Sequence, residues 1–134
     1  MKSVLISIQP KWVEKIARGE KTIEVRKTRP KIETPFKCYV YCTKPKEVVD
    51  LGKTFSWGKE VIGEFVCDDI DTVRVFNNIL YCVNNSQANK LGQMCLTIEE
   101  VKSYLGEKNG YNWHISNLKI YDKPQELFDF ANYN

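Results

Sequence analysis

The chain of 134 residues contains a single histidine, only seven glycines and five prolines, and no long uninterrupted apolar run. A helix that crosses a bilayer needs roughly 18 to 20 apolar residues in succession, so a membrane span is not expected. Met1, Lys2 and Ser3 lead directly into a strand pattern and not into a secretory signal. These absences predict a cytoplasmic protein with no membrane partner.

The five cysteines are an odd number in a chain without secretory features, which argues against a disulfide scaffold. Cys38 and Cys42 lie in one apolar strand pattern, where a spacing of four places their Cα atoms ~13 Å apart. That separation and the single histidine leave few candidate ligands for zinc. We therefore expect small core cysteines, no metal site and no cofactor.

Hydrophobic residues make up 43% of the chain, and the aromatic residues are three Trp, seven Tyr and six Phe. This composition can form a buried core, and the length fits one domain over residues 1–134. Residues 1–46 hold 12 Lys and Arg against 4 Glu, whereas residues 47–134 hold 8 against 13 acidic residues. The basic segment fits either a phosphate-binding surface or an ordinary solvated face, and charge alone does not decide between them.

Apolar periodicity predicts two short helices. The first begins at Pro10, carries an apolar stripe and ends at Gly19 after about nine residues. The second follows a capping box formed by Thr97 and Glu100 and stops at Gly106.

The same periodicity predicts six or seven strands. They cover residues 3–8, 21–27, 36–43, 60–69, 71–76, 80–83 and 112–121. The first is expected to be well buried, and the last to end at Pro124, with residues 124–134 folding back as a C-terminal clasp. Because strands mostly follow strands, we predict a mixed α+β, mainly β fold. A closed or nearly closed small barrel is favoured over a parallel sheet covered by helices.

The segment from Gly19 to Arg26, GEKTIEVR, directly follows the first helix. It resembles the G-x-K-x-x-E-x-R element of the ASCH domain family, a branch of the PUA-like superfamily. Residues 111–124, YNWHISNLKIYDKP, resemble the closing strand of small phage-like and bacterial members. The resemblance covers roughly residues 1–124. It implies a PUA-like β-barrel of about six strands with two short helices and a basic cleft beside the first helix.

The resemblance also implies a function, because ASCH proteins include suspected RNA-binding modules and enzymes that act on nucleic acid or modified nucleosides. We therefore expect RNA or a modified nucleoside as the partner. Phosphate contacts are expected from the cations that flank the first helix and the motif. They are Lys11, Lys21, Arg26, Lys27 and Arg29.

Glu24 and Arg26 lie two residues apart on one strand face, so their side chains emerge ~7 Å apart and can line one cleft. A carboxylate accepts hydrogen bonds from an amino group, and a guanidinium offers two parallel donors to phosphate or a base edge. Lys21, at the strand entrance, can contact phosphate or act as a base if it is desolvated. The alternative for Glu24 and Arg26 is an ordinary ion pair.

Other candidate ligand-binding residues also have plain structural alternatives. Trp12 can stack on a base or belong to the helix core. His114, the only imidazole, can contact a ligand or merely satisfy backbone groups. Gln9 and Ser116 can supply neutral hydrogen bonds. Glu64 lies among apolar neighbours and needs a partner such as Lys21 or Arg26, unless it is exposed.

An enzymatic alternative is a hydrolase of RNA or acylated nucleosides with Lys21 and Glu24 as catalytic groups, and with His114 for RNA cleavage. The acetylcytidine amidohydrolases of the family use a lysine, a threonine and a later glutamate. Lys21 matches that lysine, but Glu24 stands where the threonine nucleophile would be. Residues 92–95, GQMC, offer no carboxylate before the second helix, and Glu99 and Glu100 lie inside it.

Overall fold

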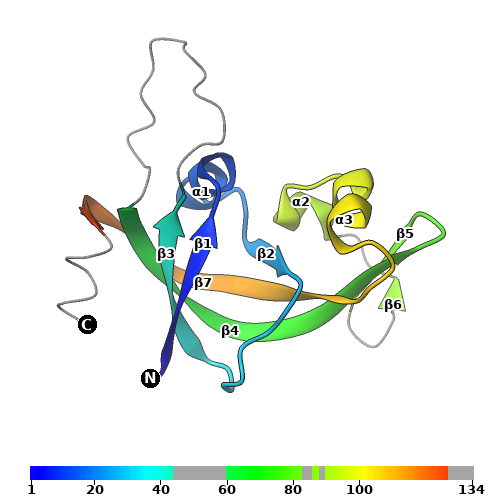
Figure 1. Cartoon of the computed structure of the whole chain (residues 1–134), viewed down its shortest axis with the longest axis horizontal. Helices are drawn as coiled ribbons and strands as arrows, with labels where there is room; N and C mark the ends of the chain where they lie inside the picture. Colours follow the sequence, from blue (N-terminus) through cyan, green and yellow to red (C-terminus); the bar gives the residue numbers. More distant parts are fainter. Residues whose placement is uncertain (44–59, 83–85, 88–89, 127–134) are drawn as a thin grey trace, which may run out of the picture.

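The structure is a computed structural model that describes residues 1–43, 60–82, 86–87 and 90–126 (Figure 1). Its strands are β1 (Ser3–Ile8), β2 (Ile23–Arg26), β3 (Phe36–Cys42), β4 (Glu60–Phe76), β5 (Ile79–Cys82), β6 (Ser86–Gln87) and β7 (Gly110–Glu126). Its helices are α1 (Pro10–Ala17), α2 (Leu91–Met94) and α3 (Ile98–Leu105). The fold is therefore mixed α and β and mainly β, as predicted.

All the strands belong to one sheet, with the order β1-β3-β4-β5-β6, while β7 pairs with β4 and β2 pairs with β7. β1 and β3 are parallel, and the other pairs are antiparallel. The prediction of a closed barrel is not confirmed, because no ladder joins β1 to β2 in the described part of the chain. The Arg26 side chain reaches across this opening, where its Nη1 donates to the Ser7 carbonyl at 3.1 Å.

β4 and β7 are 17-residue strands that run across the whole sheet (Figure 1). The prediction of separate strands at 60–69 and 71–76 was wrong, and so was the end of the last strand at Pro124. The β4–β7 ladder shifts register between Cys67 and Ile70 and again between Val61 and Gly63. Such bulges interrupt the period of two that identifies a strand, and they accommodate a proline that cannot donate to the ladder.

The two predicted helices are confirmed with close boundaries. Pro10 opens α1, and Gly19 follows it with φ +77°, a conformation that favours glycine. The Thr97 hydroxyl accepts from the Glu100 amide at 3.1 Å, and the Glu100 carboxylate accepts from the Thr97 amide at 3.0 Å. The four-residue α2 was missed because one turn is too short to show periodicity.

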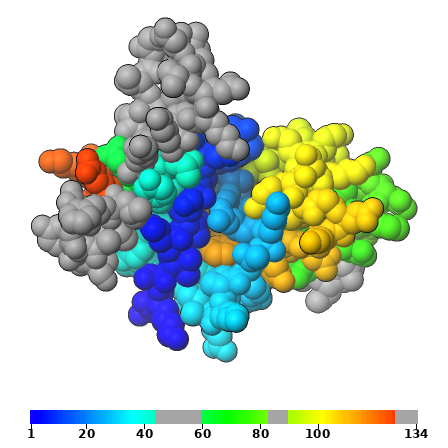
Figure 2. Space-filling model, viewed as in Figure 1, coloured from blue at the N-terminus to red at the C-terminus, as the bar shows by residue number. Residues whose placement is uncertain are grey.

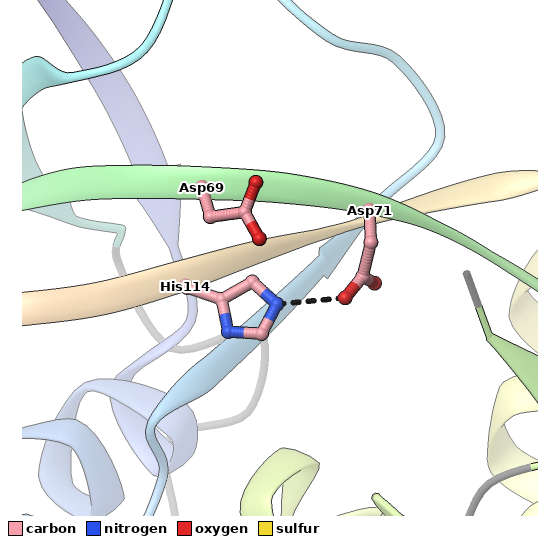
Figure 3. A group of neighbouring side chains, drawn as sticks. All are labelled: Asp69, Asp71 and His114. Carbon is pink, nitrogen blue, oxygen red and sulfur yellow. Dashed lines mark hydrogen bonds and ion pairs between the residues drawn. The ribbon is translucent and has the colours of Figure 1, made fainter.

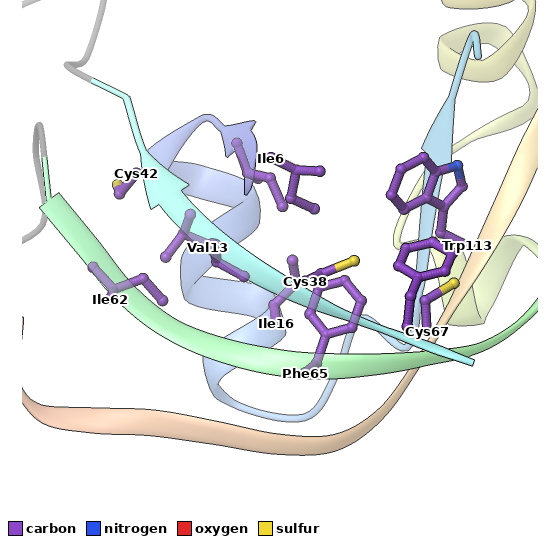
Figure 4. Close-up of a cluster of buried hydrophobic side chains, with 12 residues drawn as sticks. Ile6, Val13, Ile16, Cys38, Cys42, Ile62, Phe65, Cys67 and Trp113 are labelled. Atoms are coloured by element: carbon purple, nitrogen blue, oxygen red, sulfur yellow. The ribbon is translucent and has the colours of Figure 1, made fainter. Parts of the chain in front are cut away.

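Two hydrophobic clusters flank the sheet. The first joins α1 to β1, β3 and β4 (Figure 4). In this cluster the rings of Phe36 and Trp113 pack edge to face, with their centres 5.6 Å apart. The second joins α2 and α3 to β2, β4 and β5. Each fully buried aliphatic or aromatic side chain stabilises the fold by about 1.5 to 3 kcal/mol relative to an exposed one. The β2 side chains Ile23 and Val25 belong to the second cluster, so Glu24 between them points to the other face.

The predicted burial of individual elements is confirmed in part. Four of the five cysteines are buried in the two clusters, and no disulfide joins any of the five. Burial raises the pKa of Cys42 and of Cys67 to about 11, so these thiols stay protonated.

β1 is an edge strand and less buried than predicted, with Leu5 44% exposed. The predicted C-terminal clasp over residues 124–134 lies outside the described residues from residue 127 onward.

Among the residues that the structure describes, no helix has the length and apolar character needed to cross a membrane.

Candidate functional site

A cavity of about 570 Å³ lies beside the opening between β1 and β2. Its walls come from β1, α1, β2 and α3, and Figure 2 shows α3 (yellow) and β1 (dark blue) on either side of the light-blue residues around β2. The lining residues are Ser7, Ile8, Gln9, Trp12, Lys21, Glu24, Val25, Arg26, Leu96, Glu99, Glu100, Ser103 and Tyr104. Its volume is within the range of small-molecule sites.

Lys21, Glu24 and Arg26 form one ion-paired group in the cavity wall. Lys21 Nζ lies 3.6 Å from Glu24 Oε1, and Arg26 Nη1 lies 3.2 Å from Glu24 Oε2. The Glu24 side chain is 10% exposed and that of Arg26 29% exposed. Glu24 and Arg26 are therefore neighbours, as their spacing predicted, and Lys21, whose direction the sequence left open, joins them. The three side chains both form ion pairs and line the cavity.

Lys21 is the most deeply buried member, at 2% exposure. Its Nζ also donates to the Met94 carbonyl at 2.5 Å, which connects the segment just before β2 to α2. Desolvation lowers the pKa of Lys21 below its usual 10.5, and the Glu24 carboxylate opposes this shift only in part. Lys21 therefore lines the cavity as an amine that loses its proton more readily than an exposed lysine.

Trp12 belongs to the core, as one of the two predictions had it, and also faces the cavity. Its ring packs against the first hydrophobic cluster and also lines the cavity. Lys11 Nζ lies 4.6 Å and Lys21 Nζ lies 5.3 Å from the centre of that ring. On the α3 side, Lys27 Nζ lies 4.8 Å from the ring of Tyr104, which also lines the cavity. Lys11 and Lys27 thus stand next to aromatic lining residues without lining the cavity themselves.

The lining is not basic, in contrast to the predicted cleft. Lys21 and Arg26 are accompanied by three carboxylates, those of Glu24, Glu99 and Glu100. The carboxylates of α3 were missed because sequence reasoning placed them inside a helix without predicting which surface that helix covers. A capping box and an apolar stripe locate the helix along the chain, but not its partner across the cavity.

Other predicted site residues lie elsewhere. Ser116 Oγ donates to the Val66 carbonyl at 2.9 Å, within the sheet. Glu64 is paired with Lys37 at 2.9 Å and accepts from the Tyr121 hydroxyl at 3.2 Å, so the expected pairing of Glu64 with Lys21 or Arg26 was wrong. These contacts join residues on strands that are far apart in the sequence.

His114 does not line the cavity with Lys21 and Glu24. Its Nε2 lies 2.9 Å from Asp71 Oδ2 (Figure 3). Asp71 also accepts from Lys90 Nζ at 2.9 Å and from Asn112 Nδ2 at 2.7 Å. Burial raises the pKa of Asp71, but these hydrogen bonds outweigh burial and hold its pKa below the usual range. Asp69 completes a group whose carboxylate and imidazole atoms could hold a metal ion.

The model of the ASCH domain family matches residues 6–125. No curated protein matches the chain. The crystal structure of ASCH from Zymomonas mobilis is similar, with a TM-score of 0.71 and 20% identity over 98% of this chain and 78% of that chain. A tyrosine-to-phenylalanine mutant of that protein gives a TM-score of 0.67 and 19% identity, over 98% of this chain and 81% of that chain. At this identity the likeness is one of fold. The match over residues 6–125 shows that the chain belongs to the ASCH domain family.

Proposed function

We propose that the cavity binds a nucleobase or nucleoside, either modified or within RNA. The observation that carries this proposal is the Glu24 carboxylate, held by two cations in a cavity wall beside the Trp12 ring. Such a wall offers a hydrogen-bond acceptor, a guanidinium and an aromatic surface in one small space. These are the groups that recognise the edge and the face of an unstacked base.

The charge of the lining favours the base over the phosphate as the group that enters. Three carboxylates against two cations would repel a phosphate inside the cavity. Lys11 and Lys27, next to Trp12 and Tyr104, are better placed for phosphate contacts at the mouth. Lys21 is already bonded to the Met94 carbonyl and is expected to position Glu24. Gln9 adds a neutral polar group to the lining.

Calorimetry with a panel of nucleosides and short single-stranded RNAs tests this proposal. Glu24→Gln is expected to weaken nucleoside binding about tenfold or more, because it loses the charged acceptor. Glu107→Gln, at an exposed position outside the cavity, is the matched control and should bind normally. Lys11→Ala should weaken RNA binding and its salt dependence but leave nucleoside binding unchanged. Equal affinities for Glu24→Gln and the wild-type chain would refute the proposal.

A second candidate is hydrolysis of an acylated nucleoside. The lowered pKa of Lys21 favours it, because a more readily deprotonated amine beside Glu24 can accept a proton from water. Ser7 and Ser103 also place hydroxyl groups in the lining. The reaction would add water to the acyl carbon and release a carboxylic acid and the free nucleoside amine. Turnover lost in Lys21→Met and kept in Lys11→Ala would support this candidate, whereas binding without turnover would exclude it.

We further propose that residues 1–134 form a single domain, that this domain belongs to the PUA-like superfamily, and that the protein is cytoplasmic. The absence of a disulfide among the five cysteines, all of which the structure describes, accords with a reducing compartment.

A further inference from the structure

We propose that Asp69, Asp71 and His114 form a binding site for a divalent cation of the first transition row, for which Mn²⁺ is a suitable probe. None of the three residues lines the cavity, so this site is separate from the proposed nucleoside site. It also does not depend on the nucleoside proposal.

The three side chains converge from two neighbouring strands. Asp69 and Asp71 lie on β4, and His114 lies on β7. One ligand atom from each lies within 4.8 Å of the others (Figure 3). Asp69 is exposed and His114 is partly exposed, so an ion can reach the group, whereas Asp71 is buried at its base. Two carboxylate oxygens and one imidazole nitrogen suit Mn²⁺ and its neighbours.

Asn112 supports the group from the interior of the fold. Its side chain is completely buried, and its Nδ2 donates to Asp71 Oδ1, so the amide lies against the group. Its Oδ1 has no hydrogen-bond partner among the described residues, which is costly for a buried oxygen. Through Nδ2, Asn112 holds Oδ1 of Asp71, which leaves Asp71 Oδ2, the oxygen next to His114 Nε2, to face an ion.

Lys90 is the internal competitor for this site. Its Nζ lies 2.9 Å from Asp71 Oδ2, the same oxygen that contacts His114. The Lys90 side chain is 25% exposed, so its ammonium group can move into water when an ion binds. Removing this charge is therefore expected to strengthen ion binding, whereas a merely structural role of Lys90 gives no such gain.

The single histidine makes a direct test possible, because all imidazole NMR signals come from His114. Adding MnCl₂ to the wild-type chain is expected to broaden these signals selectively, and EDTA should restore them. Asp69→Asn, at an exposed position, should weaken the effect about tenfold, and Lys90→Met should strengthen it about tenfold. Asp68→Asn, at the neighbouring exposed position, should change nothing.

The site would be overturned if Mn²⁺ did not selectively broaden the His114 signals of the wild-type chain, or broadened them only in Lys90→Met. It would also be overturned if Asp69→Asn and Asp68→Asn changed the broadening equally. Circular dichroism shows whether each variant is folded, and the two surface variants do not rely on replacing the buried Asp71.

Discussion

The charged group of Lys21, Glu24 and Arg26 and the charged group around Asp71 are similarly buried but differently built. The carboxylates are 10% and 8% exposed, and each has at least two cationic or polar partners. Glu24 finds its cations within three residues along the chain. Asp71 finds its partners on β7 and at the start of α2, 19 to 43 residues away.

This difference shows how the same chemistry can serve two purposes. The group of Lys21, Glu24 and Arg26 lies on the edge strand β2 and just before it, beside the opening to β1, and therefore lines a cavity. The Asp71 group ties β4, β7 and Lys90 together away from that cavity. We expect Glu24 to be important mainly for nucleoside binding, and Asp71 mainly for stability and for the proposed cation site.

The largest effect on folding is expected from Asp71→Ala. This change leaves Lys90 and the buried Asn112 without their shared acceptor, so the free energy of unfolding should fall by about 3 kcal/mol. Nucleoside affinity of the folded fraction should not change. Urea unfolding and calorimetry measure the two quantities. A loss below ~1 kcal/mol would contradict the stabilising role of Asp71.

Glu24→Ala should be less destabilising and more harmful to binding. Lys21 keeps the Met94 carbonyl and Arg26 keeps the Ser7 carbonyl, so we expect a loss of about 2 kcal/mol in unfolding free energy. Nucleoside binding should be lost, because the acceptor in the cavity wall is gone. The comparison would fail if Glu24→Ala destabilised the fold more than Asp71→Ala while binding persisted.

The same difference explains what could be predicted from the sequence. Glu24 and Arg26 are two residues apart on one strand, so strand geometry placed them together, whereas it left the direction of the nearby Lys21 open. Pro10, Gly19 and the capping box similarly located the helices. The Asp71–His114 contact depends on the register of β4 with β7, where bulges break the alternation. The opening between β1 and β2 and the position of α3 also depend on long-range packing, so the carboxylates from α3 were not predicted.

Arg26→Ala should have a smaller effect. Its guanidinium is partly exposed and joins Glu24 to the Ser7 carbonyl across the open side of the sheet. We expect about 1 kcal/mol less stability and about tenfold weaker nucleoside binding. Chemical denaturation and calorimetry provide the measurements. Unchanged values for both would exclude Arg26 from the site and from bridging the opening.

The smallest effect concerns the pH dependence of stability. The native pKa of Lys21 lies below its usual 10.5, so between these two values the unfolded chain holds more protons than the folded chain. The free energy of unfolding of the wild-type chain should therefore rise, relative to Lys21→Met, as pH increases toward 10.5. Parallel denaturation curves at several pH values measure this difference. A constant or falling difference would contradict burial as the dominant cause.

Trp12 and Glu24 are proposed to lie at a nucleoside site to which His114 does not contribute. The most direct test is to titrate the chain with a nucleoside that it binds while recording the NMR signals of the Trp12 indole and the His114 imidazole. We predict a saturable shift of the Trp12 signal, lost in Glu24→Gln, with the His114 signals unmoved. Shifts of His114 alone, or of Trp12 undiminished in Glu24→Gln, would contradict the account.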